Sequence, residues 1–199
     1  MTETGAPTGA IMVVGATSGA GKSTVAAALC RSFARKGLRV APFKAQNMSN
    51  HSAVTADGGE VGRSQAVQAH AARVELDRRM NPILLKPTRN ASHVVVLGDE
   101  VSTTNAADYG EVAKLLRSTV LSALDSLRGD YPIVVAEGAG GAAEINLLDR
   151  DLVNLPWPPR PAYRRFWWWI LIEVERSRLP TARSTYSPTT CANRWSASC

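Results

Sequence analysis

Cysteine, histidine and long apolar runs are all scarce in this sequence of 199 residues. The three cysteines, Cys30, Cys191 and Cys199, share no CxxC spacing, and their layout indicates neither a CxxC metal site nor a disulfide framework. The three histidines share no metal-ligand spacing either, so we interpret them as structural. No stretch reaches the roughly 18 to 20 consecutive apolar residues that a membrane-spanning helix needs.

The start of the chain lacks the basic and apolar segments of a secretory signal peptide. We therefore expect residues 1–9 to form a disordered leader and the protein to be cytoplasmic. The length suits one α/β domain with a sizeable core and excludes two large domains.

Tryptophan and excess positive charge are missing from most of the chain and are concentrated near its end. All five tryptophans and six of the eleven prolines lie in residues 155–199, which contain no glycine. This part holds seven arginines, no lysine and two glutamates, and so accounts for +5 of the net charge of +6. The rest of the chain is close to neutral, so the total charge does not indicate a nucleic-acid-binding domain.

Residues 10–154 alternate short apolar runs with helical patterns. The expected strands are 10–16, 39–43, 93–98 and 132–136, and the expected helices are 22–37, 63–74 and 110–129. A long polar loop is expected at 44–62. Strands that alternate with helices predict a parallel sheet with ligands at the carboxyl ends of the strands.

The segment GATSGAGKST connects the first expected strand to the first expected helix. This is the context of a phosphate-binding loop, in which backbone N–H groups and the helix N-terminus surround phosphate oxygens. Five residues separate Gly15 from Gly21, one more than in the common motif. Lys22 would contact the β- and γ-phosphates of a nucleotide and Ser23 would bind Mg²⁺. The expected nucleotide-binding residues are Thr17, Ser18, Gly19, Ala20, Gly21, Lys22, Ser23 and Thr24.

The loop makes the expected fold a P-loop NTPase-like three-layer α/β sandwich with a mostly parallel sheet, incomplete at its C-terminus. A simple glycine- and serine-rich turn is the alternative interpretation of the segment. Phosphate-bound Mg²⁺ needs carboxylates as well as the loop hydroxyl, and Glu137 and Asp57 are the candidates. Lys44 could neutralise an anionic substrate. Alternatively, Glu137 is a solvated strand-end carboxylate, Asp57 belongs to an ordinary turn and Lys44 lies on the surface.

Four stretches together resemble the N-terminal synthetase domain of the cobyric acid synthase family. They are the loop itself, APFKAQNMSNHSAVTADGGEVGRSQAVQAHAA, MNPILLKPT and VVAEGAGGAAEINLLDRDLVN. The resemblance runs from about Ile11 to Asn154 and places the chain in the dethiobiotin-synthetase-like group of P-loop enzymes, whose loop has the same spacing. The middle stretch is specific to the family, whereas a phosphate loop alone is not.

The resemblance implies ATP-dependent amidation of four peripheral carboxylates of the corrinoid adenosylcobyrinic acid a,c-diamide, with ammonia from glutamine. ATP and Mg²⁺ are the implied cofactors. Lys22 and Lys44 are the implied catalytic residues, and Ser23, Asp57 and Glu137 match the metal positions. The family continues into a glutaminase domain, but Cys191 lacks the flanking glycines and the downstream His of its nucleophile. We therefore expect a fragment that has no glutaminase, that could use free ammonia at best, and that is inactive alone.

Two other interpretations stay open. A dethiobiotin synthetase or a cobyrinic acid a,c-diamide synthase would share the fold and the class of chemistry, although the QNMSNHSAVTADGGE stretch disfavours both. A partitioning-type P-loop ATPase would share the fold but would use ATP to switch a binding surface. Those ATPases usually carry a second lysine early in the loop, where this chain has Ala16 and Thr17.

The last 45 residues are expected to be a disordered tail translated out of frame. Tryptophan has one codon, so FWWWI at 166–170 is encoded as TTY-TGG-TGG-TGG-ATH. Read two bases later, these codons give Leu-Val-Val-Asp, which resembles what the family has at this point. We therefore place a frameshift near residues 155–157. The alternative is a basic, aromatic tail that binds a membrane, a nucleic acid or a protein partner.

Overall fold

The computed structural model describes residues 9–15, 17–89, 91–104, 109–139 and 167–172. The expected leader at 1–9 therefore lies almost entirely outside the described residues, as do most of the expected tail and residues 140–154 of the family resemblance. Within the described part, no helix is long and apolar enough to cross a membrane.

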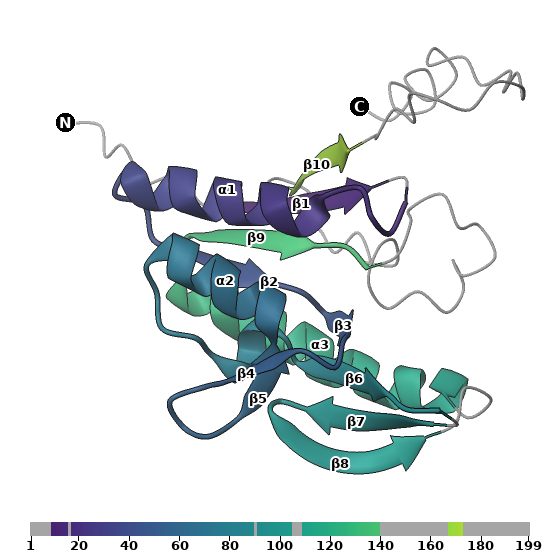
Figure 1. Cartoon of the computed structure of the whole chain (residues 1–199). Helices are drawn as coiled ribbons and strands as arrows, with labels where there is room; N and C mark the ends of the chain where they lie inside the picture. Colours follow the sequence, from purple (N-terminus) through teal and green to yellow (C-terminus); the bar gives the residue numbers. More distant parts are fainter. Residues whose placement is uncertain (1–8, 16, 90, 105–108, 140–166, 173–199) are drawn as a thin grey trace, which may run out of the picture.

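The main sheet has four parallel strands in the order β10-β1-β9-β2. Its strands are β1 (Gly9–Gly15), β2 (Val40–Phe43), β9 (Ile133–Glu137) and β10 (Trp167–Ile172). Figure 1 shows β9 beneath α1, pointing in the same direction as its neighbour β1. The predicted parallel sheet is confirmed, and its strands present their carboxyl ends at one edge.

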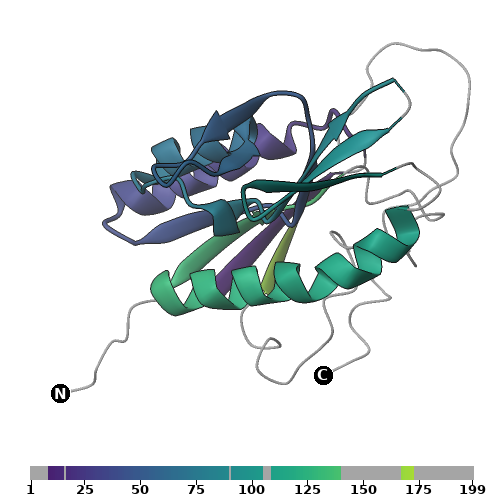
Figure 2. The ribbon, with the colours of Figure 1, turned by 90° about the horizontal axis from the view of Figure 1, so that it is seen from below.

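Helices cover both faces of this sheet, as Figure 2 shows. They are α1 (Lys22–Arg35) and α2 (Arg63–Ala72) on one face and α3 (Tyr109–Asp130) on the other. Alternate residues of β1 point to opposite faces, so Met12 packs in the core with Leu124 of α3 whereas Val13 packs with Cys30 of α1. The expected three-layer α/β sandwich is therefore present. Burial raises the pKa of the Cys30 thiol to about 12, which leaves the thiol protonated and unreactive.

A second, mixed sheet with the order β3-β6-β7-β8 lies beside the sandwich. It consists of β3 (Gln46–Met48), β6 (Ile83–Pro87), β7 (Ser92–Val96) and β8 (Asp99–Thr104). A short antiparallel pair, β4 (Ser52–Val54) and β5 (Glu60–Gly62), precedes α2, and a 3-10 helix, η1 (Arg78–Met80), precedes β6. Of these strands, the sequence pattern predicted β7 alone. The expected polar loop at 44–62 thus contains three strands that are too short to show an apolar period.

The structure differs from the expected disordered tail at residues 167–172. These six residues form β10, which pairs in parallel with β1 from Ala10 opposite Trp167 to Gly15 opposite Ile172. The prediction of disorder is wrong here for a physical reason. A run of aromatic and aliphatic residues has a high strand propensity, and pairing satisfies backbone groups on the outer edge of β1.

Candidate nucleotide-binding site

The phosphate loop lies between the end of β1 and the start of α1, as predicted. Gly15 has no room for a side chain, because a Cβ there would lie 2.8 Å from Cβ of Ala20. Gly21 adopts a left-handed φ of 86° and precedes α1 without a side-chain cap hydrogen bond. The first turn of α1 therefore keeps backbone N–H groups for an anionic ligand.

The predicted nucleotide-binding residues surround this turn. Lys22 is buried, and its Nζ donates hydrogen bonds to the carbonyl oxygens of Thr17 at 2.9 Å and Ser18 at 3.3 Å. These hydrogen bonds hold the loop in a curled conformation around the lysine. The loop residues that a ligand could reach are exposed, and they are Thr17, Ser18, Gly19, Gly21, Ser23 and Thr24, whereas Ala20 is buried.

Glu137 is the centre of a buried polar cluster at the end of β9. Its residue surface is 2% exposed, and its Oε1 accepts hydrogen bonds from Ser23 Oγ and Lys44 Nζ, both at 2.7 Å. Ser23 follows the loop after β1, Glu137 ends β9 and Lys44 follows β2. The carboxyl ends of three neighbouring strands therefore bring together three residues that the sequence predicted for one site.

Sequence analysis missed Gln68, which holds the other oxygen of this carboxylate. Gln68 Nε2 donates to Glu137 Oε2 at 2.6 Å and to the carbonyl oxygen of Ser23 at 3.4 Å. Gln65 lies one turn earlier on the same face of α2 and donates to Gln68 Oε1 at 3.4 Å. Both glutamines are fully buried. Two polar residues three positions apart on a buried helix face were the available signal.

The buried polar network continues from α2 to the strands around it. Asn47 Nδ2 donates to Gln65 Oε1 at 3.2 Å. Asn81 Oδ1 accepts from the backbone N–H of Gly62 at 2.9 Å, and Asn81 Nδ2 donates to the carbonyl oxygen of Lys44 at 3.0 Å. The backbone of Lys44 is therefore fixed by the network, while its side chain extends to Glu137.

The structure does not bring Asp57 to this cluster. Asp57 lies in the turn between β4 and β5, where Gly58 has a left-handed φ of 85°, and Thr55 Oγ1 donates a hydrogen bond to its carboxylate. Its Oδ2 pairs with Arg78 Nε at 2.7 Å, and Arg78 also pairs with Asp99 at 2.7 Å. Asp57 therefore links the β4–β5 hairpin to η1 through its ion pair with Arg78.

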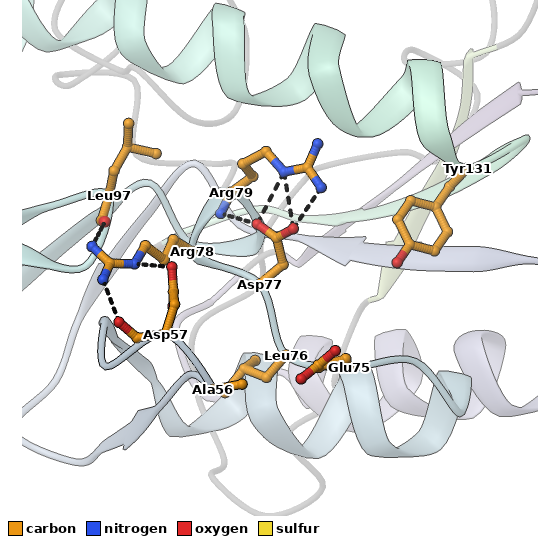
Figure 3. Close-up of a pocket in the computed structure, with 9 residues that line it drawn as sticks. All are labelled: Ala56, Asp57, Glu75, Leu76, Asp77, Arg78, Arg79, Leu97 and Tyr131. Carbon is orange, nitrogen blue, oxygen red and sulfur yellow. Dashed lines mark hydrogen bonds and ion pairs between the residues drawn. The ribbon is translucent and has the colours of Figure 1, made fainter.

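Asp57 also lines a cavity of about 450 Å³ at the other end of the sheet. Figure 3 shows Asp57 and Arg78 on one side of this cavity and Tyr131 on the other. Tyr131 precedes β9, whereas Glu137 ends it, so the length of the strand separates the two regions. Of the three predicted metal ligands, Ser23 and Glu137 therefore lie together, whereas Asp57 lies apart from them.

Three carboxyl groups on this side of the molecule make stability dependent on pH. Burial opposes ionisation of Asp77, but hydrogen bonds from Arg79 lower its pKa. Hydrogen bonds from Thr55 and Arg78 lower the pKa of Asp57, and those from Lys86 and Ser52 lower that of Glu60. Each group is thus more acidic in the folded state than at its ordinary value of 3.8 for Asp or 4.5 for Glu.

Because the folded-state pKa values are lowered, the stabilisation is present above these ordinary values and is lost as pH falls through the lower folded values. We expect the urea midpoint to stay level above about pH 5 and to fall steadily below about pH 4. Urea unfolding measured across this range tests the prediction. In the Glu60→Gln variant the fall should be shallower, and an identical profile would exclude Glu60 as a contributor.

The donors at Glu137 suit Mg²⁺. Ser23 Oγ and Glu137 Oε1 are hard oxygen atoms of the kind that Mg²⁺ prefers, and they lie together beside the phosphate loop, where a nucleotide's phosphates and water would supply the other ligands. Among the described residues, no group of three or more His, Cys, Asp or Glu side chains could hold a metal by itself. The arrangement thus fits an ion delivered with a nucleotide.

A strand, a glycine-rich loop, a helix without a cap and a carboxylate at the neighbouring strand end define a P-loop nucleotide-binding domain. Residues 11–155 match the family model described as the CobQ/CobB/MinD/ParA nucleotide binding domain. The chain therefore belongs to this family.

The chain is similar to curated cobyric acid synthases. It is 55% identical over 148 residues to the cobyric acid synthase of Rhodococcus jostii (strain RHA1). This match covers 74% of this chain and 29% of the relative. It is 52% identical over 147 residues to a probable cobyric acid synthase of Methanocella arvoryzae, covering 73% of this chain and 30% of the relative. The chain thus spans less than a third of these relatives' length.

Among solved structures, the chain is similar to the signal recognition particle receptor FtsY of Elizabethkingia anophelis. That match has a TM-score of 0.34 and 22% identity, and it covers 74% of this chain and 35% of that chain.

Proposed function

We propose that this chain is the ATP-binding synthetase part of a cobyric acid synthase. It would amidate the b, d, e and g carboxylates of adenosylcobyrinic acid a,c-diamide through an acyl phosphate. The observation that carries the proposal is the convergence of Ser23 and Lys44 on Glu137 beside the phosphate loop. The similarity to cobyric acid synthases over three quarters of the chain supports the choice of substrate.

The chemistry requires an activated carboxylate, because the oxygen of a free carboxylate is a very poor leaving group. Transfer of the γ-phosphoryl group of ATP to the substrate carboxylate supplies phosphate as the leaving group, and ammonia then displaces it. Phosphoryl transfer depends mainly on positioning and on charge neutralisation. Lys22 and the loop amides would hold the β- and γ-phosphates, and the Lys44 ammonium would orient the anionic carboxylate of the corrinoid.

Mg²⁺ bound with ATP would neutralise charge on the transferred phosphoryl group. Ser23 and Glu137 are the residues that would hold it. Gln68 fixes the orientation of the Glu137 carboxylate, and the Asn81 side chain fixes the backbone at Lys44. Ammonia would come from a glutaminase domain of the kind that the family carries after this one.

Calorimetric titration with ATP and Mg²⁺ tests the nucleotide site. We expect binding by the natural chain and a loss of affinity of at least about tenfold in Lys22→Ala, because a charged contact to phosphate is removed. Asp57→Asn is the matched control and should bind as the natural chain does. Loss of Mg²⁺-dependent binding in Asp57→Asn would contradict the placement of the metal at Ser23 and Glu137.

The substrate is tested separately by ATP hydrolysis with ammonium chloride and adenosylcobyrinic acid a,c-diamide. We expect the corrinoid to stimulate phosphate release and Lys22→Ala to abolish the stimulation. Stimulation by DNA or by lipid vesicles in place of the corrinoid would instead support a partitioning-type ATPase.

A further inference from the structure

Lys44 and Ser23 meet at the same oxygen atom. Lys44 Nζ and Ser23 Oγ each lie 2.7 Å from Oε1 of Glu137. The Lys44 side chain is 11% exposed and that of Glu137 is 1% exposed. A buried carboxylate is stable only when a cation or several donors compensate its charge. The Lys44 ammonium therefore neutralises Glu137 at the same oxygen atom that Ser23 contacts.

The other oxygen of the carboxylate is held differently. Oε2 accepts from the neutral amide of Gln68 at 2.6 Å, and Gln68 is fully buried in α2 with Gln65 behind it. The amide fixes the carboxylate without supplying charge. Oε1 is thus the oxygen at which cations can exchange while the orientation of the carboxylate stays constant.

We infer that the Lys44 ammonium occupies the cation position of Glu137 in the nucleotide-free protein and leaves it when Mg²⁺ arrives with the nucleotide. This inference rests on the proposed function. Two cations on one oxygen repel each other, and the divalent ion has the greater attraction for a carboxylate. The flexible four-carbon stem of lysine allows the ammonium to move while the backbone of Lys44 stays fixed by Asn81.

The exchange would make the nucleotide with its Mg²⁺ bind first and the anionic substrate second. Before the nucleotide binds, the ammonium of Lys44 is paired with Glu137 and is not available to an anionic substrate. After Mg²⁺ replaces it, the same ammonium becomes available to the carboxylate that is to be phosphorylated. Lys44 would thus bind substrate when ATP is already in place, which limits unproductive occupancy of the site by the substrate.

The experiment measures the dissociation constant of ADP by calorimetry with and without Mg²⁺. The ratio of the two constants reports how strongly Mg²⁺ assists nucleotide binding. In Lys44→Met the competing ammonium is absent, so we expect the ratio to rise by about tenfold over that of the natural chain. Lys86→Met is the matched control, because Lys86 forms a 2.7 Å ion pair with Glu60 on the surface. Its ratio should equal that of the natural chain.

A second variant is needed because Lys44→Met leaves the buried charge of Glu137 without a cation and can prevent folding. Lys44→Arg keeps a positive charge, and a guanidinium binds a carboxylate through two hydrogen bonds. We expect its ratio to be lower than that of the natural chain by several-fold. A second readout is thermal unfolding, in which Mg²⁺ and ADP should raise the Tm of Lys44→Met by more than that of the natural chain.

The possible results separate the inference from the proposed function. ADP binding by the natural chain, with a ratio in Lys44→Met that is unchanged or lower, would overturn the cation exchange and leave the nucleotide site intact. A ratio in Lys44→Arg equal to or above that of the natural chain would overturn it equally. A natural chain that binds no ADP in either condition would contradict the proposed function and the exchange with it.

Discussion

Glu137→Gln is expected to lower the free energy of unfolding by about 3–5 kcal/mol, because removing one partner of a buried ion pair leaves the other charge without compensation. The amide retains the shape of the carboxylate but presents no negative charge to Lys44, whose Nζ lies 2.7 Å from Oε1. The same variant should lose the assistance of Mg²⁺ in nucleotide binding. Urea unfolding and calorimetry on one preparation measure both effects.

Glu60→Gln is the control for this prediction. Glu60 and Lys86 are also 2.7 Å apart, but both side chains are about 30% exposed, with values of 27% and 31%. Such a pair contributes about 0–1 kcal/mol. Equal losses in the two variants would show that Glu137 and Lys44 are screened by water. The double variant Lys44→Met, Glu137→Gln should recover part of the loss, because it removes both buried charges.

Gly62→Ala is the second variant with a large expected effect. A Cβ at this position would lie 2.1 Å from Asn47 Nδ2 and 3.0 Å from both Asn81 Oδ1 and Gln65 Oε1. The new methyl group must displace side chains of the buried polar network and leave donors and acceptors unpaired. We expect a loss of about 2–4 kcal/mol in the free energy of unfolding. Because Asn81 supports the backbone of Lys44, nucleotide-dependent activity should fall as well.

Gly129→Ala is the matched control, with an effect of opposite sign. Gly129 lies near the end of α3, and a Cβ there would meet nothing within 4 Å. Alanine at an exposed helical position stabilises by about 0.5–1 kcal/mol over glycine. A Gly62→Ala protein as stable as the natural chain would show that the network can rearrange without loss of hydrogen bonds.

The sequence was sufficient to predict the parts of the site that depend on local chemistry. Gly15, Gly21 and Lys22 occur between an apolar run and a helical pattern, and this order of segments is typical of a phosphate loop. Glu137 and Lys44 were predictable because Glu137 ends one buried strand and Lys44 follows another, and parallel strands end at one edge. Their direct contact at 2.7 Å required the strand order, in which β9 lies between β1 and β2.

The rest of the site depends on contacts between distant segments. Gln65 and Gln68 are polar residues on a helix, and a pattern alone does not distinguish a buried polar face from a solvated one. The sequence predicts Asp57 at the metal because it lies in a glycine-rich loop that the family resemblance covers. The structure instead pairs it with Arg78, which is 21 positions away in the chain. No local signal specifies that partner.

The tryptophan run is a segment whose structure the sequence analysis did not predict. Its codons indicate a shifted reading frame, and this stays a prediction. Its residues nevertheless form a strand beside β1, because strand formation depends on side-chain shape and apolarity and not on the origin of the segment. The codons that residues 155–199 imply therefore predict a shifted reading frame but not the strand at residues 167–172.

The absence of a side-chain cap at Gly21 has a consequence for the lifetime of the polypeptide. Helix α1 begins with backbone amides that no side chain caps and that the phosphate oxygens of a bound nucleotide would satisfy. A ligand at a hundred times its Kd adds about 2.7 kcal/mol to the stability of the folded state. We therefore expect bound nucleotide to protect the chain from proteolysis and nucleotide-depleted cells to degrade it faster.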